Sequence, residues 1–380
     1  MTIPQTDTLD FIGLSDLHYF YTGAEGPPLK AHRDAALRYV DNRARGETGR
    51  ESHELVLNNC RALLAGIMGV PAQNVAILSN ASEALHRITE GIPWRSGSNV
   101  VTCDIEFPSV TLPLVQLRER GIDVRVVSSH DWQVTTADIA RSVDDKTQAI
   151  VVSHVSYMSG SRFDLEELAS LAREVGALLI VDATQSLGVV PVEAHLADFV
   201  ISSTYKWLLG PHGCGVVYVR DPESSPIQPR HVGWRSVQHM FADDRFERYD
   251  LWPDARRWEL GYPSFPSLYL LEASLEYLTR YEPRAIETHV HELGDVLLEG
   301  AAELGMTLMT SQDSSRRAGN IAIRASSPER LAEDLAARKI LAWGGDGRIR
   351  FSIHLFNDRG DIEAALSALR ELVPKGSAGQ

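Results

Sequence analysis

The sequence contains few cysteines, no long apolar run and fewer basic than acidic residues. Its three cysteines, Cys60, Cys103 and Cys214, are odd in number and are not spaced as metal ligands. This argues against a disulfide framework and fits a reducing compartment, so we expect the thiols to pack in the core. No apolar run reaches the roughly 18–20 residues that a membrane span needs, and residues 1–10 are too polar for a secretory signal peptide. We therefore expect a cytoplasmic protein.

Acidic residues outnumber basic ones by 51 to 37, which gives a formal net charge of −14 at pH 7. This acidity argues against nucleic acid and anionic membranes as partners, although a local basic pocket can still hold a phosphate group. We expect a small-molecule substrate instead. With 380 residues, of which 44% are hydrophobic and 23% charged, the chain is an ordinary globular protein that exceeds one core, and two domains are predicted.

A central segment places an acidic and a basic side chain after two successive strands. The apolar run 177–181 is too short for a helix of its own and is predicted to be a buried parallel strand that ends at Asp182. A second apolar run, 199–201, is followed by hydroxyl residues and then Lys206. In open α/β sheets, ligands bind at the edge formed by the strand C-termini. We therefore expect both side chains at one ligand site.

A lysine and a carboxylate at neighbouring strand ends suit pyridoxal phosphate. The lysine amine can form a Schiff base with an aldehyde. The carboxylate can keep a ring nitrogen protonated, because a nearby negative charge favours the cationic form. Taken singly, Asp182 could instead be a capping residue and Lys206 a solvated loop lysine.

Two motifs in this segment resemble those of a known enzyme class. Residues 182–185, Asp-Ala-Thr-Gln, and 203–206, Ser-Thr-Tyr-Lys, are similar to the D-x-x-Q and S-x-[HY]-K signatures of class V, fold-type I pyridoxal-phosphate enzymes. This group contains cysteine desulfurases, kynureninases and isopenicillin N epimerase-like proteins. The resemblance implies an α/β fold with a mostly parallel sheet sandwiched by helices in a large domain, and a smaller α+β C-terminal domain. It also implies a homodimer with active sites near the subunit interface.

The chain can be divided on this basis. We expect an N-terminal arm at 1–16 that packs with the small domain, a large cofactor-binding domain at 17–264 and a small domain at 265–380. The region 228–258 is aromatic and charged without a clear period, and is predicted to be irregular. Strands are expected at 75–78, 99–103, 123–127, 149–152, 216–219 and 320–323, with a helix at 138–143.

The resemblance assigns cofactor contacts to several strand ends. The turn after strand 75–78 matches the family's phosphate cup, although a Ser-x-x-Glu pattern by itself is usually a helix cap. Phe107 is expected to stack on the cofactor ring, where desulfurases usually place a histidine that can also exchange protons. His154 is either a support behind the ring or a core histidine. The implied contacts are Asn80, Ala81, Ser82, Ser203 and Tyr205 at the phosphate, Phe107 and His154 at the ring, Asp182 at the ring nitrogen, Gln185 at the ring hydroxyl and Lys206 as the covalent partner.

A second motif suggests how a substrate is held. Residues 349–357 are similar to the class V pattern [LI]-R-[IFA]-S-x-x-x-[YF]-N, whose arginine binds the α-carboxylate of an amino acid. Arginine suits this role because its planar fork pairs with a carboxylate through two hydrogen bonds. The candidate is Arg350, and the alternative is an ordinary surface arginine.

The reaction type is less constrained than the cofactor. Class V desulfurases carry a nucleophilic cysteine on a loop before the arginine strand, and this chain has none at 339–347. We therefore expect no persulfide-forming desulfuration. The favoured hypothesis is an enzyme acting at the α-carbon of an amino acid as a lyase, cleaving a C–S bond of a cysteine conjugate by β-elimination in small-molecule biosynthesis. Lys206 is its acid/base and Asp182 its partner at the ring nitrogen. An aminotransferase, an epimerase, a decarboxylating variant and a non-catalytic pyridoxal-phosphate-binding relative remain as alternatives.

Overall fold

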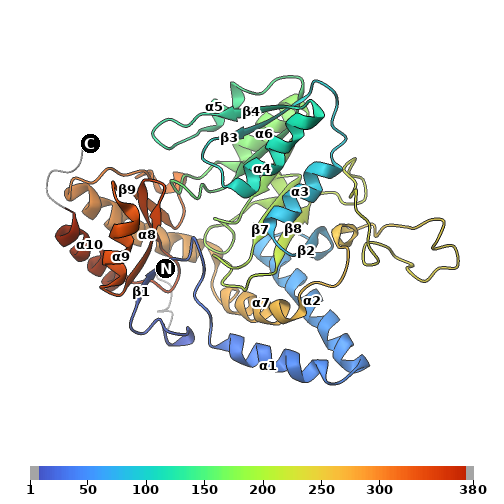
Figure 1. The fold of residues 1–380 in the computed structure, drawn as a ribbon, viewed down its shortest axis with the longest axis horizontal. Coiled ribbons are helices and arrows are strands. Elements are labelled where there is room, and N and C mark those ends of the chain that lie inside the picture. The colour runs from blue at the N-terminus through green and yellow to red at the C-terminus, as the bar shows by residue number, and fades with distance from the viewer. Residues whose placement is uncertain (1–7, 374–380) are drawn as a thin grey trace.

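A computed structural model describes residues 8–373 of the chain. These residues form two β-sheets, one of seven strands and one of four (Figure 1). The larger sheet consists of β2 (Val75–Leu78), β3 (Asn99–Cys103), β4 (Asp123–Val127), β5 (Thr147–Ser153), β6 (Leu178–Asp182), β7 (Phe199–Ser203) and β8 (Gly215–Val219). The smaller sheet consists of β1 (His18–Phe20), β9 (Asn320–Arg324), β10 (Ile340–Gly345) and β11 (Arg348–Ser352).

Ten α-helices and six short 3-10 helices accompany the sheets in the described residues. The α-helices are α1 (Ala31–Arg43), α2 (Glu47–Met68), α3 (Ala81–Gly91), α4 (Pro108–Gln116), α5 (Thr136–Ala140), α6 (Leu165–Val175), α7 (Phe265–Leu278), α8 (Pro283–Glu303), α9 (Pro328–Ala336) and α10 (Arg359–Leu372). The 3-10 helices are Thr8–Asp10, Ala72–Asn74, Leu117–Arg120, Ala194–Leu196, Ala255–Trp258 and Ser314–Arg316.

The larger sheet has the strand order β2-β8-β7-β6-β5-β3-β4, and β8 alone in it runs against the other strands. Parallel strands bring their C-terminal ends to the same edge of a sheet. In the register, Ser153 at the end of β5 is level with Asp182 at the end of β6, and Asp182 is level with Ile201 of β7. Residues that are distant in sequence therefore meet at one edge.

Both faces of the larger sheet are buried, as expected for a mostly parallel sheet. Along β6, Ile180 belongs to one apolar cluster and its neighbours Leu179 and Val181 to another. Helices α3 and α4 cover the first face, whereas α2, α5, α6 and α7 contribute to the cluster on the other. This arrangement confirms the predicted α/β fold class.

Local signals set the ends of the helices. The Asp164 side chain accepts hydrogen bonds from two backbone amides at the start of α6, and Gly176 ends this helix with a φ of 68°. The helix expected at 138–143 instead begins at Thr136 and ends at Ala140. The reason is a capping box, in which the side chains of Thr135 and Asp138 each bind the other residue's backbone amide.

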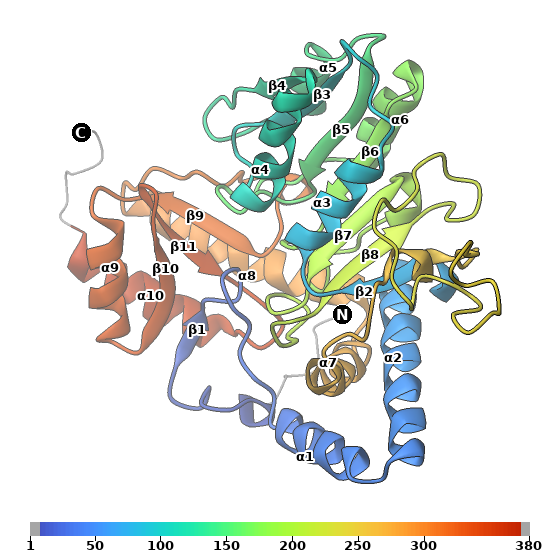
Figure 2. The ribbon, with the colours of Figure 1, turned by 45° about the vertical axis from the view of Figure 1, so that its right-hand side comes forward.

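The smaller sheet combines the two ends of the chain. Its strand order is β1-β10-β11-β9, with β1 parallel to β10 and the other pairs antiparallel. Helices α8, α9 and α10 lie with this sheet at the left of Figure 1, and the turned view in Figure 2 shows β1 reaching it from the N-terminal part of the chain.

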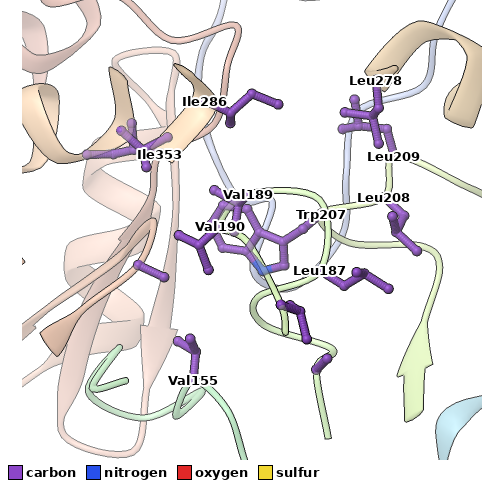
Figure 3. Close-up of a cluster of buried hydrophobic side chains, with 14 of the residues drawn as sticks. Val155, Leu187, Val189, Val190, Trp207, Leu208, Leu209, Leu278, Ile286 and Ile353 are labelled. Atoms are coloured by element: carbon purple, nitrogen blue, oxygen red, sulfur yellow. The ribbon is translucent and has the colours of Figure 1, made fainter. Parts of the chain in front are cut away.

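A cluster of buried apolar side chains lies between the larger and the smaller sheet and contains residues from both sides (Figure 3). Trp207 is fully buried and lies among Val189 and Val190 from the larger sheet's side and Ile353 and Ile286 from the smaller sheet's side (Figure 3). Because Trp207 directly follows Lys206 in the chain, this packing fixes the backbone beside the lysine.

The predicted domain limits stay predictions. Residues 1–7 of the expected arm lie outside the described residues, and within the rest of it Phe11 packs against the rings of Tyr277 and Phe356. Helix α7, placed by the sequence in the small domain, packs on α1 and α2. This packing favours a boundary after α7 rather than at residue 264.

Candidate active site

A pocket lies at the edge where the parallel strands of the larger sheet end. The space within it, counting the part that is open to solvent, is about 410 Å³. Its wall consists of Ala81, Ser82, Phe107, Ser109, Ser153, Tyr157, Asp182, Thr184, Gln185, Ser203, Tyr205 and Lys206. Eight of the eleven residues assigned to the site from the sequence therefore line one cavity; Asn80, His154 and Arg350 do not.

Lys206 lies at the base of this pocket with 7% of its surface exposed. Its Nζ atom is 5.3 Å from the centre of the Phe107 ring and 5.7 Å from that of Tyr205. The pKa of Lys206 is lowered to about 8, mainly by burial and also by the positive charge of Arg350, while the charge of Asp182 opposes both effects. The amine is thus a better nucleophile and base near neutral pH than an ordinary lysine.

Asp182 is buried at the end of β6, and its Oδ1 atom accepts a 2.8 Å hydrogen bond from the backbone amide of Thr184. Burial raises its pKa, while the Thr184 hydrogen bonds and the Lys206 charge lower it. The Thr184 hydroxyl in turn accepts a 3.1 Å bond from the amide of Ser203. The two motif segments are therefore linked through Thr184, and the carboxyl is held in place.

The start of α3 forms another part of the wall. The backbone amide of Ala81 donates to the Ser203 hydroxyl at 3.4 Å, and the Ser82 side chain faces the same cavity. A helix N-terminus offers backbone amides and a positive dipole end to an anion. Asn80 caps this helix, with its Oδ1 atom accepting from the amide of Glu83 at 2.8 Å. Asn80 is therefore the cap of α3 and is not part of the pocket wall, although it directly precedes Ala81, which is.

Aromatic rings form the outer side of the pocket. Phe107 packs edge-on against Tyr157, with ring centres 5.1 Å apart, and is 42% exposed. Tyr205 stacks on His212 at a centre-to-centre distance of 4.1 Å. An exposed ring beside a buried lysine is an available stacking partner for a flat ligand.

Gln185 makes three side-chain hydrogen bonds within the protein. Its Oε1 atom accepts from Trp207 at 2.8 Å and from Asn320 at 2.9 Å, and its Nε2 atom donates to the Gly23 carbonyl at 3.0 Å. One Nε2 hydrogen remains for a ligand. The predicted contact with a ring hydroxyl stays a prediction, and the structure gives Gln185 an additional bridging position between distant segments.

Arg350 extends from β11 toward this pocket without being part of its wall. Its Nη1 atom donates to the Tyr157 carbonyl at 2.9 Å, and its Nε atom has no hydrogen-bond partner within residues 8–373. The side chain is buried, and burial together with the Arg348 charge lowers its pKa to about 9. Arg350 is close enough to Lys206 for its positive charge to lower the pKa of the lysine.

His154 lies outside the wall. Its ring is buried, its Nε2 atom accepts a 3.2 Å bond from Arg162, and its backbone amide donates to the Asp182 carbonyl at 2.9 Å. Burial lowers the pKa of His154, so the ring is neutral. Of the two interpretations of this residue, the core histidine agrees with these contacts.

The sequence analysis missed other polar residues at this edge. Glu106 is buried and accepts bonds from the amide of Ser153 at 2.7 Å and from the Ser153 hydroxyl. The pKa of Glu106 is raised to about 7, mainly by burial and also by nearby Asp182, against the lowering effect of the Ser153 hydrogen bonds. Ser153 could have been found, since it ends β5 as Asp182 ends β6. Glu106 gave no such signal because it follows its strand in a turn.

The comparison with protein families matches residues 33–364 to the model of the class V aminotransferases. The chain belongs to this family. Enzymes of this family depend on pyridoxal phosphate, so the predicted cofactor, the recognised class and the assignment as an enzyme are confirmed.

Curated relatives of this class V protein carry related names. A probable cysteine desulfurase of Methanothermobacter thermautotrophicus is 27% identical over 94% of this chain and 96% of its own length. An uncharacterized aminotransferase of Bacillus subtilis is 28% identical over 80% of each chain. Among solved structures, a cysteine desulfurase from Thermococcus onnurineus has a TM-score of 0.88 with 24% identity, covering 98% of this chain and 99% of that one. A cystine C–S lyase complex with cysteine persulfide has a TM-score of 0.87 with 21% identity, covering 96% of this chain and 100% of that one.

The residues of this class V site fit the cofactor. Lys206 is a buried amine without a hydrogen bond to any described residue, Asp182 is a buried carboxyl in the wall of the same pocket, and α3 begins at this wall. Lys206 would hold the aldehyde, Asp182 the ring nitrogen, and Ser82 with Ser203 the phosphate. When bound, the cofactor supplies an electron sink that stabilises negative charge at the α-carbon of an amino acid. The arrangement of Asp182, Lys206 and Phe107 allows this chemistry at one place.

Within residues 8–373 no helix is both long enough and apolar enough to cross a bilayer. Location in the cytoplasm stays an expectation.

Proposed function

We propose that this class V enzyme cleaves the C–S bond of a cysteine S-conjugate by β-elimination. The α-hydrogen leaves as a proton to Lys206 Nζ, and the Cβ–S bond breaks with its electron pair on sulfur, which leaves as a thiol after protonation. Water converts the remaining three-carbon fragment to pyruvate and ammonium. The observation that carries the proposal is that none of the protein's own thiols is placed to accept sulfur.

All three cysteines are buried, with at most 1% of their surfaces exposed. Burial raises the pKa of each thiol, to about 12 for Cys214 and well above the usual range for Cys60 and Cys103. The thiolate is the form that attacks sulfur. An enzyme that forms a protein persulfide needs an accessible thiolate, and these three cysteines do not supply one.

The segment before Arg350 also argues against a mobile nucleophile. Strands β10 and β11 are joined by a two-residue turn, Asp346-Gly347, since Gly345 pairs directly with Arg348. Both turn residues have positive φ angles, 46° and 74°. Asp-Gly is a strong signal for such a tight hairpin. There is accordingly a short turn, and no cysteine, where desulfurases carry their nucleophile on a loop.

Lys206 is suited to the proton transfer. Its Nζ atom lies at the base of the pocket, and its pKa of about 8 allows it to take a proton and return one near neutral pH. Arg350 is positioned to hold the α-carboxylate, because its Nε atom lacks a partner in the described structure and its charge reaches Lys206. A cystine C–S lyase has the same fold, so the fold is compatible with this class of reaction.

Pyruvate and ammonia assays test the proposal. The cofactor-loaded enzyme is incubated with L-cysteine S-conjugates, with Lys206→Ala as the inactive control. We expect equal amounts of pyruvate, ammonia and free thiol over many turnovers. Formation of a 2-oxo acid that keeps its sulfur, in stoichiometric amounts, would identify an aminotransferase. Inversion at the α-carbon without thiol release would identify an epimerase, and either result contradicts elimination.

A second copy of the chain is proposed as its partner. Large apolar side chains are exposed in the irregular segment 228–258, including Phe241 at 82%, Phe246 at 85% and Tyr249 at 61%. This segment projects from the body of the protein at the right of Figure 1. Clustered exposed aromatic side chains are typical of protein–protein contacts. Sedimentation of the wild type and of a Phe241→Ser/Phe246→Ser variant tests whether a homodimer depends on them.

A further inference from the structure

Two buried arginines lie side by side on one strand of the smaller sheet. Arg348 and Arg350 are two residues apart on β11, so their side chains emerge on the same face, with Cα atoms about 7 Å apart. Arg348 is 0% exposed and Arg350 is 3% exposed. The predicted role in carboxylate binding concerned Arg350 alone.

The two guanidinium groups have few hydrogen-bond partners within residues 8–373. The Nε and Nη2 atoms of Arg348 and the Nε atom of Arg350 have none. The other polar contacts of Arg348 are 3.4 Å distances from Nη1 to the carbonyl and to a carboxylate oxygen of Asp346, and a side-chain contact with the Tyr157 hydroxyl. The Asp346 side chain is 59% exposed, so its charge is screened by water.

Besides the exposed Asp346 carboxylate, aromatic rings lie against the Arg348 guanidinium. Its guanidinium carbon is 4.7 Å from the centre of the Trp343 ring and 5.1 Å from that of Tyr157. The nearby Tyr157 phenol and Asp346 raise the pKa of Arg348, but burial lowers it by more. Cation–π contacts partly offset the loss of hydration, yet the Nε and Nη2 atoms of Arg348 keep no hydrogen-bond partner in the described residues.

A buried pair of like charges is unfavourable unless an anion is close. Burial lowers the pKa of both arginines, and the charge of Arg348 lowers that of Arg350 further, to about 9. Uncompensated buried charge is costly, whereas two arginines facing two anionic groups form charge-assisted hydrogen bonds. One α-carboxylate can satisfy Arg350. The Nε and Nη2 donors of Arg348 are then left for a second anion.

The position of Arg348 connects it to the same pocket. Tyr157, whose ring lies against its guanidinium, is also in the pocket wall with Lys206. Both Tyr157 and Trp343 are partly exposed, so they form the cover between Arg348 and the pocket. Because Arg348 is 0% exposed, binding of a ligand to its Nη2 atom requires the Tyr157 ring to move.

We propose that Arg348 binds a second anionic group on the substrate, and that the substrate is therefore an amino acid whose side chain ends in a carboxylate or sulfonate. This inference deepens the proposed elimination, on which it rests for the identity of the substrate as a cysteine S-conjugate. The anionic group is then carried by the substituent on sulfur. Arg350 takes the α-carboxylate and Arg348 selects the side chain.

A pair of ligands that differ in one charge tests the site without turnover. 3-(Carboxymethylsulfanyl)propanoate and 3-(carbamoylmethylsulfanyl)propanoate have nearly the same shape and no amino group, so neither reacts. Calorimetric titration of each into the cofactor-loaded wild type is expected to give at least about tenfold tighter binding of the dianion, since a charge-assisted bond is strong when buried. Equal affinities would overturn the proposal without any variant being needed.

The variants then assign the effect to one residue. Arg348→Gln is expected to reduce the preference for the dianion to about onefold while keeping the affinity for the monoanion. The matched control is Arg324→Gln, because Arg324 pairs with Arg348 in the sheet register but is exposed. It should keep the full preference. A preference that survives in Arg348→Gln, or that is lost equally in Arg324→Gln, contradicts the role of Arg348.

Steady-state kinetics with two cysteine conjugates test the anion site and the proposed elimination independently of each other. S-Carboxymethyl-L-cysteine is compared with S-carbamoylmethyl-L-cysteine, and kcat/KM is expected to favour the charged conjugate by at least about tenfold in the wild type. If the dianion is bound preferentially but no pyruvate forms, elimination is wrong and the anion site stands. If pyruvate forms equally from both conjugates and the binding is unselective, elimination stands and the anion site is wrong.

Discussion

The indole Nε1 atom of Trp207 donates a 2.8 Å hydrogen bond to the Oε1 atom of Gln185. The same oxygen accepts from Asn320 on β9, and the Gln185 Nε2 atom donates to the carbonyl of Gly23. One amide therefore joins the segment of Lys206, the smaller sheet and the N-terminal segment at Gly23. The position of Lys206, which precedes Trp207, depends on this bridge.

Replacing Gln185 should destabilise the protein strongly. Gln185→Ala leaves the buried indole of Trp207 and the amide of Asn320 without an acceptor, and each buried unsatisfied group costs about 1–3 kcal/mol. We expect the free energy of unfolding to fall by about 2–5 kcal/mol in urea titrations of the cofactor-free protein. Gln116→Ala is the control, since Gln116 is exposed and its side chain caps nothing. A loss below about 1 kcal/mol would show that the bridge is not structural.

The sequence predicted the strand ends well because their signals are local. Apolar runs that end in a polar residue identified Asp182 and the segment of Lys206, and parallel pairing brought them together. Residues whose position depends on tertiary contacts were missed. The segment of β10, treated as part of a loop, is a strand because it pairs with β1, which lies near the other end of the chain, and forms a hairpin with β11. Arg348 lies beside Arg350 because the two residues are two apart on β11, but the sequence does not signal that buried donors of both side chains lack a partner in the described residues.

The amine of Lys206 should react with the cofactor's aldehyde at unusually low pH. Imine formation needs the neutral amine, and with a pKa of about 8 roughly a quarter of it is neutral at pH 7.5, against about a thousandth at a pKa of 10.5. The rate of cofactor uptake by the cofactor-free protein, followed by visible absorbance, should therefore rise with pH to a midpoint near 8. Arg350→Gln removes one of the causes of the low pKa and should move the midpoint upward. A midpoint near 10 in the wild type would contradict the role of burial.

Glu106 should make the stability of the protein fall as pH rises. The folded protein keeps the proton of Glu106 up to about pH 7, whereas an exposed glutamate loses it near 4.5. Between these values the folded state binds more protons than the unfolded state, so the free energy of unfolding decreases, by about 3 kcal/mol over the whole window. Glu106→Gln keeps an acceptor for the Ser153 amide and should abolish this decrease. Urea titrations from pH 5 to pH 7.5 measure it, with the exposed Glu119→Gln as the control. An identical pH dependence in Glu106→Gln and the wild type would rule out this effect.

The thiols should be unreactive in the folded protein. Cys60, Cys103 and Cys214 are buried, and the pKa of each is raised, so a thiol reagent should modify none of them within minutes at pH 8 and all three after denaturation. Counting modified thiols by mass spectrometry gives the result. A cysteine labelled at once in the native enzyme, especially one protected by substrate, would reopen the possibility of a protein persulfide.

A methyl group at position 23 should weaken substrate binding. A Cβ atom on Gly23 would lie 2.5 Å from Asn320 Oδ1, 2.6 Å from Ser352 Oγ and 3.2 Å from Arg350 Nη2. The contacts with Asn320 and Ser352 are too short to persist, so the strand residues that support Arg350 must shift. We expect Gly23→Ala to raise KM by about tenfold, with a loss of stability of about 1–3 kcal/mol from overpacking.

The matched control for this change is a glycine with free space around it. Gly66 lies in α2, and a Cβ atom there would meet nothing within 4 Å. Gly66→Ala should leave KM unchanged and stabilise the helix by up to about 1 kcal/mol, because alanine loses less backbone entropy than glycine on folding. Steady-state kinetics on one cysteine conjugate and thermal unfolding of both variants provide the comparison. If Gly23→Ala lowers stability but keeps the KM of the wild type, Arg350 tolerates the displacement and its contact with the substrate must be sought elsewhere.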